Sequence, residues 1–390
     1  MAWWTSTPVG ACGRSCLLGS VTARHVYVHV PFCARRCSYC DFSIAVRRTV
    51  PARAFAERVR DELAVREEPA RAVDTIYLGG GTPSRLGGDG VAWLLDAVRE
   101  RCAPDAGAEI TLEANPEDVS PDHARAWAAA GVTRVSLGVQ SFHDPVLQWM
   151  HRVHDAAAVP RAMDVLREAG LSDVSVDLIF AVPAELSRDW ARDVDAALAL
   201  APTHVSLYGL TIEPGTPLGR WTARGAVREA PEERYAAEFL EAHARLTAAG
   251  FTHYEVSNYA RPDHRARHNS AYWQQVPYLA LGPSAHGFDG RERRWNVSAY
   301  AAWDAEVRAG RDPCGGLELL TEENRRAEAV YLGLRTVEGL PLASEEATLV
   351  APWIEAGWLQ VGADGVARCT AEGWLRLDAL AATLTSHRSR

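Results

Sequence analysis

The sequence of 390 residues contains no lysine, so all 41 of its basic residues are arginine. Schiff-base and pyridoxal-phosphate mechanisms and phosphate-binding P-loops depend on a lysine amine, so these function classes are excluded. An excess of positive charge is also lacking, because the formal net charge is -9. Sequence-independent binding to nucleic acid needs a basic surface, and we therefore expect no nucleic-acid partner.

Long apolar runs and a disulfide framework are lacking as well. No apolar stretch approaches the roughly 18 residues that a membrane span needs, and the first residues lack the basic and apolar regions of a signal peptide. Of the eight cysteines, three are clustered and the others are scattered, unlike a secreted disulfide scaffold. We therefore expect a cytoplasmic protein without stable membrane insertion.

The clustered cysteines are Cys33, Cys37 and Cys40, which directly follow the alternating apolar stretch 25–30. Three thiolates this close on one loop can hold three corners of a four-iron cluster and leave one iron open to a small molecule. A zinc site is an alternative, but structural zinc usually has four ligands in two separated pairs, and no second matching pair follows. Free structural cysteines are the other alternative, although such residues rarely cluster outside metal sites.

Between about residues 25 and 250, short β-branched runs alternate with longer helical patterns, which predicts repeated βα units around a parallel sheet of the α/β class. Six such units predict a partial, open (β/α)6 barrel rather than a closed barrel of eight. We expect strands at 25–30, 75–78, 108–112, 134–137, 174–179 and 204–207, and helices at about 52–67, 89–102, 121–130, 155–169, 187–199 and 231–249.

The chain is predicted to divide into a flexible N-terminal extension (1–23), the barrel (24–250), a connecting region (251–320) and a small C-terminal domain (321–390). The connecting region is expected to hold extended pieces at 251–256 and 294–297 with a loop between them, and then a helix at 298–309. The last region is expected to hold helices near 321–335 and 344–357, strands around 359–361 and 366–368, and a helix from Ala371. This order resembles a winged helix, which in an acidic chain favours a partner or lid surface over DNA binding.

Each predicted barrel strand ends in a polar or glycine-rich string, and barrel sites gather at the carboxyl ends of strands. Glycines let the backbone approach a ligand, carboxylates accept hydrogen bonds from an ammonium or a ribose, and a guanidinium binds a carboxylate. Alternatively, the glycines form a tight turn, Arg152 is a solvated charge and the tyrosines are core aromatics. The candidate binding residues are Tyr27, Tyr39, Gly80, Gly81, Thr82, Glu113, Gln140, Arg152 and Asp177.

The spacing C-x3-C-x2-C, with an aromatic residue before the last cysteine, resembles the signature of the radical S-adenosylmethionine (SAM) superfamily. In that superfamily the amino and carboxylate groups of SAM chelate the open iron, and an electron from the cluster cleaves SAM to a radical. The glycine string there contacts the SAM amino group. The resemblance implies a 4Fe-4S cluster on Cys33, Cys37 and Cys40 and SAM on the candidate binding residues.

From about Val26 to the C-terminal region, the strings together resemble the branch that contains oxygen-independent coproporphyrinogen III dehydrogenase and a group of haem chaperones. The run from His268 to Trp273 matches the H-N-x-x-Y-W string associated with haem binding in those chaperones. An imidazole can be an axial iron ligand, and aromatic rings offer flat faces to a porphyrin. A hydrogen-bonded loop histidine capped by two aromatics is the alternative. The resemblance implies haem on His268, Asn269, Tyr272 and Trp273, with His268 on the iron and His286 as a second candidate for it.

The resemblance therefore implies a haem chaperone that passes haem to an apo-haemoprotein, such as a respiratory enzyme, and that can form a homodimer. One alternative is the dehydrogenase, which has a further cysteine where this chain has Phe42, and a long N-terminal segment where this chain has only some two dozen residues before its first strand. A radical SAM methyltransferase of the same branch is the second alternative, and the haem string disfavours it.

The remaining cysteines have no expected role in binding. Cys12 and Cys16 repeat part of the cluster spacing, but no third cysteine follows at the right distance and no strand precedes them. Cys102, Cys314 and Cys369 are expected to be small buried apolar residues.

Overall fold

The computed structural model describes residues 23–389, so the predicted N-terminal extension lies almost wholly outside the described residues, together with Cys12 and Cys16. The described chain forms two compact units, each built from segments that are distant in the sequence. The first unit contains the described residues up to Leu178, then Thr211–Arg228 and Gln275–Leu319; the second contains Ile179–Leu210, Glu229–Gln274 and Leu320 onwards. The predicted domain boundaries at 24–250, 251–320 and 321–390 stay a prediction.

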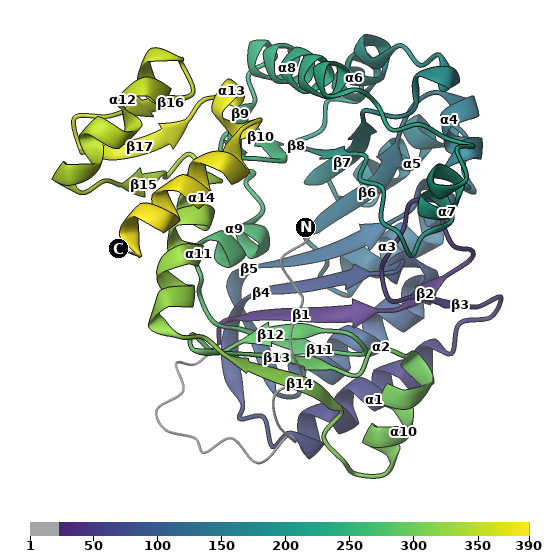
Figure 1. Cartoon of the computed structure of the whole chain (residues 1–390). Coiled ribbons are helices and arrows are strands. Elements are labelled where there is room, and N and C mark those ends of the chain that lie inside the picture. The colour runs from purple at the N-terminus through teal and green to yellow at the C-terminus, as the bar shows by residue number, and fades with distance from the viewer. Residues whose placement is uncertain (1–22, 390) are drawn as a thin grey trace. The chain divides into compact units, whose positions relative to one another are not determined.

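One mixed sheet organises the first unit, and Figure 1 shows its strands side by side. On one side of β1, the four strands β4, β5, β6 and β7 follow, each parallel to its neighbour. On the other side, β11 is parallel to β1, and the next three strands are each antiparallel to their neighbours. The carboxyl end of β13 therefore lies at the same edge as the carboxyl end of β1. The strands in spatial order are β14 (Cys314–Leu319), β13 (Glu292–Asn296), β12 (His286–Phe288), β11 (Tyr278–Leu281), β1 (His25–Val30), β4 (Arg71–Gly80), β5 (Cys102–Ala114), β6 (Arg134–Gln140) and β7 (Val174–Phe180).

The two faces of this sheet differ in polarity, because successive side chains of a strand point to opposite faces. On β1, Val26, Val28 and Val30 are fully buried, and Tyr27 and His29 lie on the other face. The apolar side is covered by helices, whose buried residues recur at helical spacing. The helical segments of the first unit are α1 (Ala52–Val65), η1 (Pro83–Leu86), α2 (Gly87–Arg99), η2 (Pro116–Asp118), α3 (Pro121–Ala129), α4 (Asp144–Trp149), α5 (Ala158–Glu168), α7 (Pro217–Ala223) and α10 (Tyr300–Arg308).

A buried carboxylate joins α1 to the part of the sheet that lies beyond β1. Glu62 of α1 is 0% exposed and accepts hydrogen bonds from the backbone nitrogen of Gly282 (2.8 Å) and from Asn296 Nδ2 (2.7 Å). Trp303 Nε1 of α10 also donates to Glu62, at 3.0 Å. An ion pair with Arg66 accompanies these bonds. Segments more than 200 residues apart in the sequence are thereby fixed to one another.

The second unit contains seven α-helices among its described residues. Its strands β8 (His204–Gly209), β10 (Asn258–Ala260) and β9 (Thr252–Glu255) are neighbours in this order and pair antiparallel, and a separate three-stranded antiparallel sheet has the order β15 (Leu340–Pro341), β17 (Val366–Cys369), β16 (Leu359–Val361). A cluster of buried leucines and valines, including Leu334, Leu359 and Leu384, forms a core. The helical segments are η3 (Ala184–Leu186), α6 (Trp190–Ala199), α8 (Glu232–Ala248), α9 (Arg267–Trp273), α11 (Glu322–Leu334), η4 (Ser344–Glu346), α12 (Ala347–Glu355), α13 (Ala371–Trp374) and α14 (Leu377–Arg388).

The strands and helices predicted between residues 25 and 249 are confirmed, although β4 begins four residues and β5 six residues before the predicted start. The helix, hairpin, helix order at the C-terminal end is confirmed as well. The loop expected between 256 and 294 is wrong, because β10, α9, β11 and β12 lie there. These elements have three to seven residues each, which is too short for their hydrophobic periodicity to stand out. In residues 23–389, no helix combines the length and apolar character needed to cross a membrane.

Candidate functional site

The three clustered cysteines lie on a loop at the carboxyl end of β1. Cys33 ends β2 (Phe32–Cys33), which pairs with β3 (Ala45–Val46), so the loop returns to its starting point. Its middle is fixed at Ser38, whose nitrogen donates to the carbonyl of Met150 (3.1 Å) and whose carbonyl accepts from Leu218 (2.8 Å). Cys33 is buried, Cys37 and Cys40 are half-buried, and all three are free thiols. The predicted cluster ligands are thus gathered on one anchored loop.

Burial opposes the ionisation of the Cys33 and Cys40 thiols unless a cation is bound. Burial raises the pKa of Cys33, although its Sγ lies 3.3 Å from the Thr82 hydroxyl, which acts in the opposite direction. Burial also raises the pKa of Cys40 to about 11. A metal centre replaces the thiol protons and stabilises the thiolates. Within the described part of the chain, no three His, Cys, Asp or Glu side chains are grouped to share one metal ion.

Arg152 brings a positive charge to the cysteine loop. Its Nη1 lies 3.8 Å from Cys37 Sγ, and its Nη2 donates at 2.6 Å both to Asn115 Oδ1 and to the carbonyl of Gly138. The Nε atom is buried without a hydrogen-bond partner. A Cβ at Gly138 would lie 3.2 Å from Nη2 and 3.1 Å from Gln140 Nε2, so glycine allows both side chains to approach this strand. Arg152 is therefore a fixed cation beside the predicted cluster and not a solvated charge.

The triple-glycine string 79–81 begins with the last two residues of β4 and packs against β1. A Cβ at Gly80, whose φ is +110°, would lie 2.6 Å from the His29 ring, and one at Gly81 would lie 2.8 Å from the carbonyl carbon of Pro31. The nitrogen of Gly81 donates to the Val30 carbonyl at 2.8 Å. Thr82 continues the turn to the cysteines through its contact with Cys33. The glycine string and the cysteine loop therefore form one continuous surface, as the sequence predicted.

Glu113, near the end of β5, is tied to the glycine turn. Its Oε1 accepts from the Tyr77 hydroxyl (2.8 Å) and its Oε2 from the nitrogen of Gly80 (2.9 Å). Burial raises the pKa of Glu113 to about 7, with the charge of Asp177 acting in the same direction. Tyr77 in turn stacks on Tyr27, with ring centroids 6.1 Å apart. A buried, oriented carboxylate of this kind can bind a cationic group of a ligand.

The other predicted SAM residues lie at the same carboxyl edge of the sheet. Asp177 accepts hydrogen bonds from the hydroxyls of Ser136 (2.8 Å) and Ser175 (3.0 Å). Gln140 ends β6 with a φ of +67°, a strained value for a residue with a side chain. Tyr39 lies between the second and third cysteines, and burial raises its pKa.

Sequence reasoning missed several polar residues that support this site. His29 accepts a hydrogen bond from the Tyr27 hydroxyl (3.0 Å) and donates from Nε2 to the carbonyl of Ser43 (2.9 Å). Glu117 lies 3.3 Å from His154 Nδ1, and burial, which alone would raise its pKa, is outweighed by His154 and by Arg152, so the pKa is lowered. The alternation of β1 could have indicated His29, because it shares a face with Tyr27. No comparable signal marks His154.

The predicted haem string lies in the second unit and forms helix α9. His268 is 0% exposed, and its Nε2 lies 2.7 Å from the hydroxyl of Tyr272, one helical turn away. The guanidinium of Arg335 lies 5.0 Å from the centroid of the Trp273 ring, and the Nε1 of Trp273 is buried without a hydrogen-bond partner. Asn269 is half-buried. The helix therefore gathers an imidazole, a phenol and an indole, but the imidazole is engaged by the phenol.

The residues of the first unit fit the group that the sequence implied. Three thiols on one loop, a buried guanidinium with an unpartnered nitrogen, and a glycine turn without room for a Cβ provide sulfur, charge and backbone contacts for a metal cluster and a zwitterionic ligand. The other described cysteines lie elsewhere. Cys102 is buried as expected, and Cys314 and Cys369 are half-buried.

Comparison with known proteins agrees with the superfamily that the cysteine motif resembles. The family model described as the radical SAM superfamily matches residues 27–197. The haem chaperone HemW of Mycobacterium tuberculosis is 42% identical over 324 residues, which cover 82% of this chain and 83% of that protein. HemW of Synechocystis is 34% identical over 353 residues, covering 86% of this chain and 85% of that protein.

Among solved structures, the coproporphyrinogen III oxidase HemN of Escherichia coli, described as a radical SAM enzyme, is similar with a TM-score of 0.79. The match covers 95% of this chain and 92% of that one, at 22% sequence identity. At this identity the likeness concerns the fold alone, and it confirms the predicted partial barrel with its C-terminal extension.

Proposed function

Because the chain belongs to the HemW family of the radical SAM superfamily, we propose that it is a haem chaperone, which binds haem and transfers it to an acceptor haemoprotein. The 42% identity to a haem chaperone over 82% of the chain carries this proposal. The gathering of His268, Tyr272 and Trp273 on α9 supports it, because these side chains supply an iron ligand and flat aromatic faces.

The first unit is proposed to hold the cofactors of the superfamily. When bound, a 4Fe-4S cluster supplies electrons and an open iron for SAM. Cys33, Cys37 and Cys40 would bind the cluster. Arg152, beside Cys37, would pair with a carboxylate, and Glu113, beside Gly80, with an ammonium group. The proposed SAM contacts are Tyr27, Tyr39, Gly80, Gly81, Thr82, Glu113, Gln140, Arg152 and Asp177.

In this proposal His268 is the iron ligand, so it must exchange its hydrogen-bond partner Tyr272 for the iron when haem binds. His268 Nε2 cannot bind iron while it shares a hydrogen bond with the Tyr272 hydroxyl. Since the two residues lie on one helical turn, a rotation of the Tyr272 side chain would release the imidazole without unfolding α9. Haem capture in the second unit therefore includes a local rearrangement of this helix.

The alternative function, coproporphyrinogen III dehydrogenase, has less support. The fold likeness to HemN is at 22% identity, whereas the sequence likeness to the chaperones is much higher. Phe42 occupies the position of the further cysteine of the dehydrogenase and is 58% exposed. The chain thus presents an aromatic side chain where that enzyme has a thiol.

A haemin titration tests the proposed function. The wild-type protein is expected to produce a Soret band, and His268→Ala is expected to weaken and shift it, because an axial ligand is lost. His387→Ala on α14 is the matched control, since it removes a half-buried histidine of the same unit without touching α9. Absence of haemin binding by the wild-type protein would refute the proposal. In parallel, turnover of coproporphyrinogen III with dithionite and SAM under anaerobic conditions would establish the dehydrogenase instead.

The setting and partners of this activity are also proposals. A cluster with an open iron needs a reducing compartment, which supports a cytoplasmic location. The acceptor is proposed to be an apo-haemoprotein, and its identity as a respiratory enzyme and the formation of a homodimer stay predictions from the family resemblance.

A further inference from the structure

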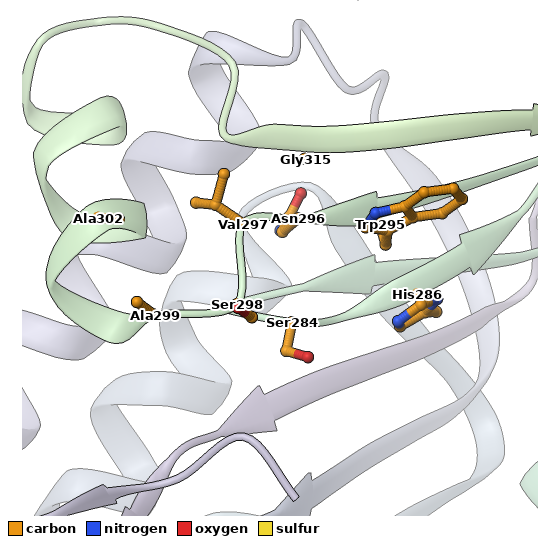
Figure 2. A pocket seen from close by; sticks show the side chains of 9 residues that line it. All are labelled: Ser284, His286, Trp295, Asn296, Val297, Ser298, Ala299, Ala302 and Gly315. Atoms are coloured by element: carbon orange, nitrogen blue, oxygen red, sulfur yellow. The ribbon is translucent and has the colours of Figure 1, made fainter. Parts of the chain in front are cut away.

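The end of the cysteine loop adjoins a cavity without fixed charge. The Ser43 hydroxyl donates to the carbonyl of Ser298 at 2.6 Å, and Ser298 lines a cavity of about 510 Å³ in the first unit. Figure 2 shows this lining, in which the rings of His286 and Trp295 are stacked with centroids 5.7 Å apart. Among the described residues that line the cavity, none is an arginine, an aspartate or a glutamate. The cavity therefore supplies no fixed charge to the predicted cluster.

Arg152 supplies such a charge through its contact with the cysteine loop. The acceptors of its side-chain hydrogen bonds are Cys37 Sγ at 3.8 Å, and Asn115 Oδ1 and the carbonyl of Gly138, both at 2.6 Å. An amide and a carbonyl fix the guanidinium without cancelling its charge, whereas a carboxylate in their place would form an ion pair with it. The positive charge of Arg152 is therefore left to act on the sulfur of Cys37.

The side chain of Asn115 does not take the local role that its position favours. Asn115 directly follows β5 and is the N-cap residue of η2, where an asparagine side chain usually accepts a hydrogen bond from the helix. Here no such bond is formed, and Oδ1 accepts from Arg152 instead. A Cβ at Gly138 would lie 3.2 Å from this oxygen and 3.2 Å from Arg152 Nη2, so glycine gives the two groups room to meet.

A carboxylate does lie nearby, but the amide of Asn115 separates it from the guanidinium. Asn115 Nδ2 donates to Glu117 Oε1 at 3.4 Å, and Glu117 Oε2 lies 3.3 Å from Nδ1 of the buried His154. His154 is fixed in turn by the carbonyl of Val139, 3.1 Å from its Nε2. Burial alone would raise the pKa of Glu117, but His154 and Arg152 outweigh it, so Glu117 is ionised at neutral pH.

We propose that Asn115 is a positioning residue, which holds the guanidinium of Arg152 against Cys37 without neutralising it and thereby raises the reduction potential of the cluster. A positive charge beside a cluster thiolate stabilises the reduced cluster, which carries one more electron. An amide suits this position because it accepts from Arg152 through oxygen and donates to Glu117 through nitrogen, whereas a carboxylate could only accept. This inference rests on the proposed assignment of the cluster to the three cysteines and deepens it.

A potentiometric titration of the reconstituted full-length protein tests this inference. Dithionite gives up electrons through mediators, each cluster takes up one, and the paramagnetic resonance signal of the reduced cluster is followed. Asn115→Asp is expected to lower the reduction equilibrium constant at least about tenfold, a shift of about 59 mV for one electron, because the new carboxylate neutralises Arg152. Asn115→Leu, which keeps the size of the side chain, is expected to shift the potential less in the same direction, because the guanidinium loses its anchor.

A double-mutant cycle distinguishes a role through Arg152 from a structural one. In an Arg152→Gln background, Asn115→Leu should change the reduction equilibrium by no more than about twofold. Gln148→Glu on α4 is the matched control for Asn115→Asp, because it adds the same negative charge at an exposed position, where solvent screens it. This control is also expected to stay within about twofold of the wild-type protein.

The possible outcomes separate this inference from the cofactor assignment. If the clusters of the wild-type protein and Asn115→Leu have equal potentials, or if Asn115→Leu shifts the potential equally with and without Arg152, the inference is overturned and the cluster assignment stands. If the wild-type protein assembles no cluster, the assignment itself fails. Iron analysis and circular dichroism of each variant show whether the cluster and the fold are intact, and Asn115→Leu decides if Asn115→Asp does not assemble.

Discussion

Glu113 is the residue on which the electrostatics of the proposed SAM-binding surface depend most directly. Its carboxylate is fixed by donors from Tyr77 and Gly80, and burial raises its pKa to about 7, while the charge of Asp177 acts in the same direction. In the ligand-free protein it therefore carries a proton for much of the time at neutral pH. Tyr27, whose pKa burial also raises, supplies no compensating charge on this face.

A pH dependence of SAM binding follows from this residue. A cationic ammonium group prefers the ionised carboxylate, so a proton competes with SAM below about pH 7. The affinity of the reconstituted protein for SAM is expected to fall by up to about tenfold per pH unit between pH 7 and pH 6, and to level off above pH 8. In Glu113→Gln the affinity should be low and independent of pH over this range. Calorimetric titration measures both, and equal pH profiles for the two proteins would contradict the assignment.

The same residue also affects stability, in a direction that can be stated. Because the pKa in the folded protein lies above the unfolded value of 4.5, Glu113 favours the folded state fully below pH 4.5 and loses this contribution as the pH rises through about 7. A bound cationic ligand would stabilise the ionised carboxylate and would therefore offset this loss of stability.

At the residue scale, the sequence predicted which residues line the site, but it did not predict the hydrogen bonds that hold them in place. Glycines and a carboxylate at strand ends are visible as local strings, and the structure places Gly80 and Glu113 within hydrogen-bond distance. His29 and Asn115 were missed because their roles depend on which side chains from other strands face them. Such side-chain contacts depend on the register of neighbouring strands, which cannot be read from a short stretch of sequence.

At the scale of elements, helix α1 is predicted to depend on one buried carboxylate. Glu62→Ala would leave donors on Gly282, Asn296 and Trp303 without an acceptor and Arg66 without its partner. Loss of one partner from a buried charged network costs about 3–5 kcal/mol, so the urea midpoint of the first unit should fall markedly.

Glu57 on the same helix is the matched control. It is exposed and forms only a surface ion pair with Arg53, at 3.5 Å. Glu57→Ala should change the stability by less than about 0.5 kcal/mol. Equal urea midpoints for the two variants would show that Glu62 does not anchor α1.

The sequence did not predict the short elements α9, β11 and β12, which pack against segments that are distant in the chain. The haem string was expected in a loop, but α9 forms there over seven residues and places His268 and Tyr272 on one turn. Strands β11 and β12 are short, and their stability comes from pairing beyond β1 rather than from propensity. The long strands and helices of the βα units carry enough periodic residues to be recognised without their partners.

At the scale of the whole molecule, cluster binding and haem binding are predicted to be separable. His268 belongs to a different compact unit from Cys33, Cys37 and Cys40. Replacement of all three cysteines by serine should therefore abolish cluster absorbance but change haemin affinity by no more than about twofold. Parallel iron analysis and haemin titration measure the two properties. Loss of haemin binding together with the cluster, in a variant with native circular dichroism, would show that the sites are coupled.

The neighbour of β1 on one side is β11, which is encoded far downstream and is secured by the bond from Gly282 to Glu62. During synthesis at about 5–20 residues per second, β1 and its cysteine loop must wait for about 250 further residues before this edge can close. Throughout that interval the nascent chain exposes an unpaired strand beside three reactive thiols. We therefore expect cluster insertion only after β11 has been synthesised, and a ribosome stalled before Tyr278 should carry an iron-free product.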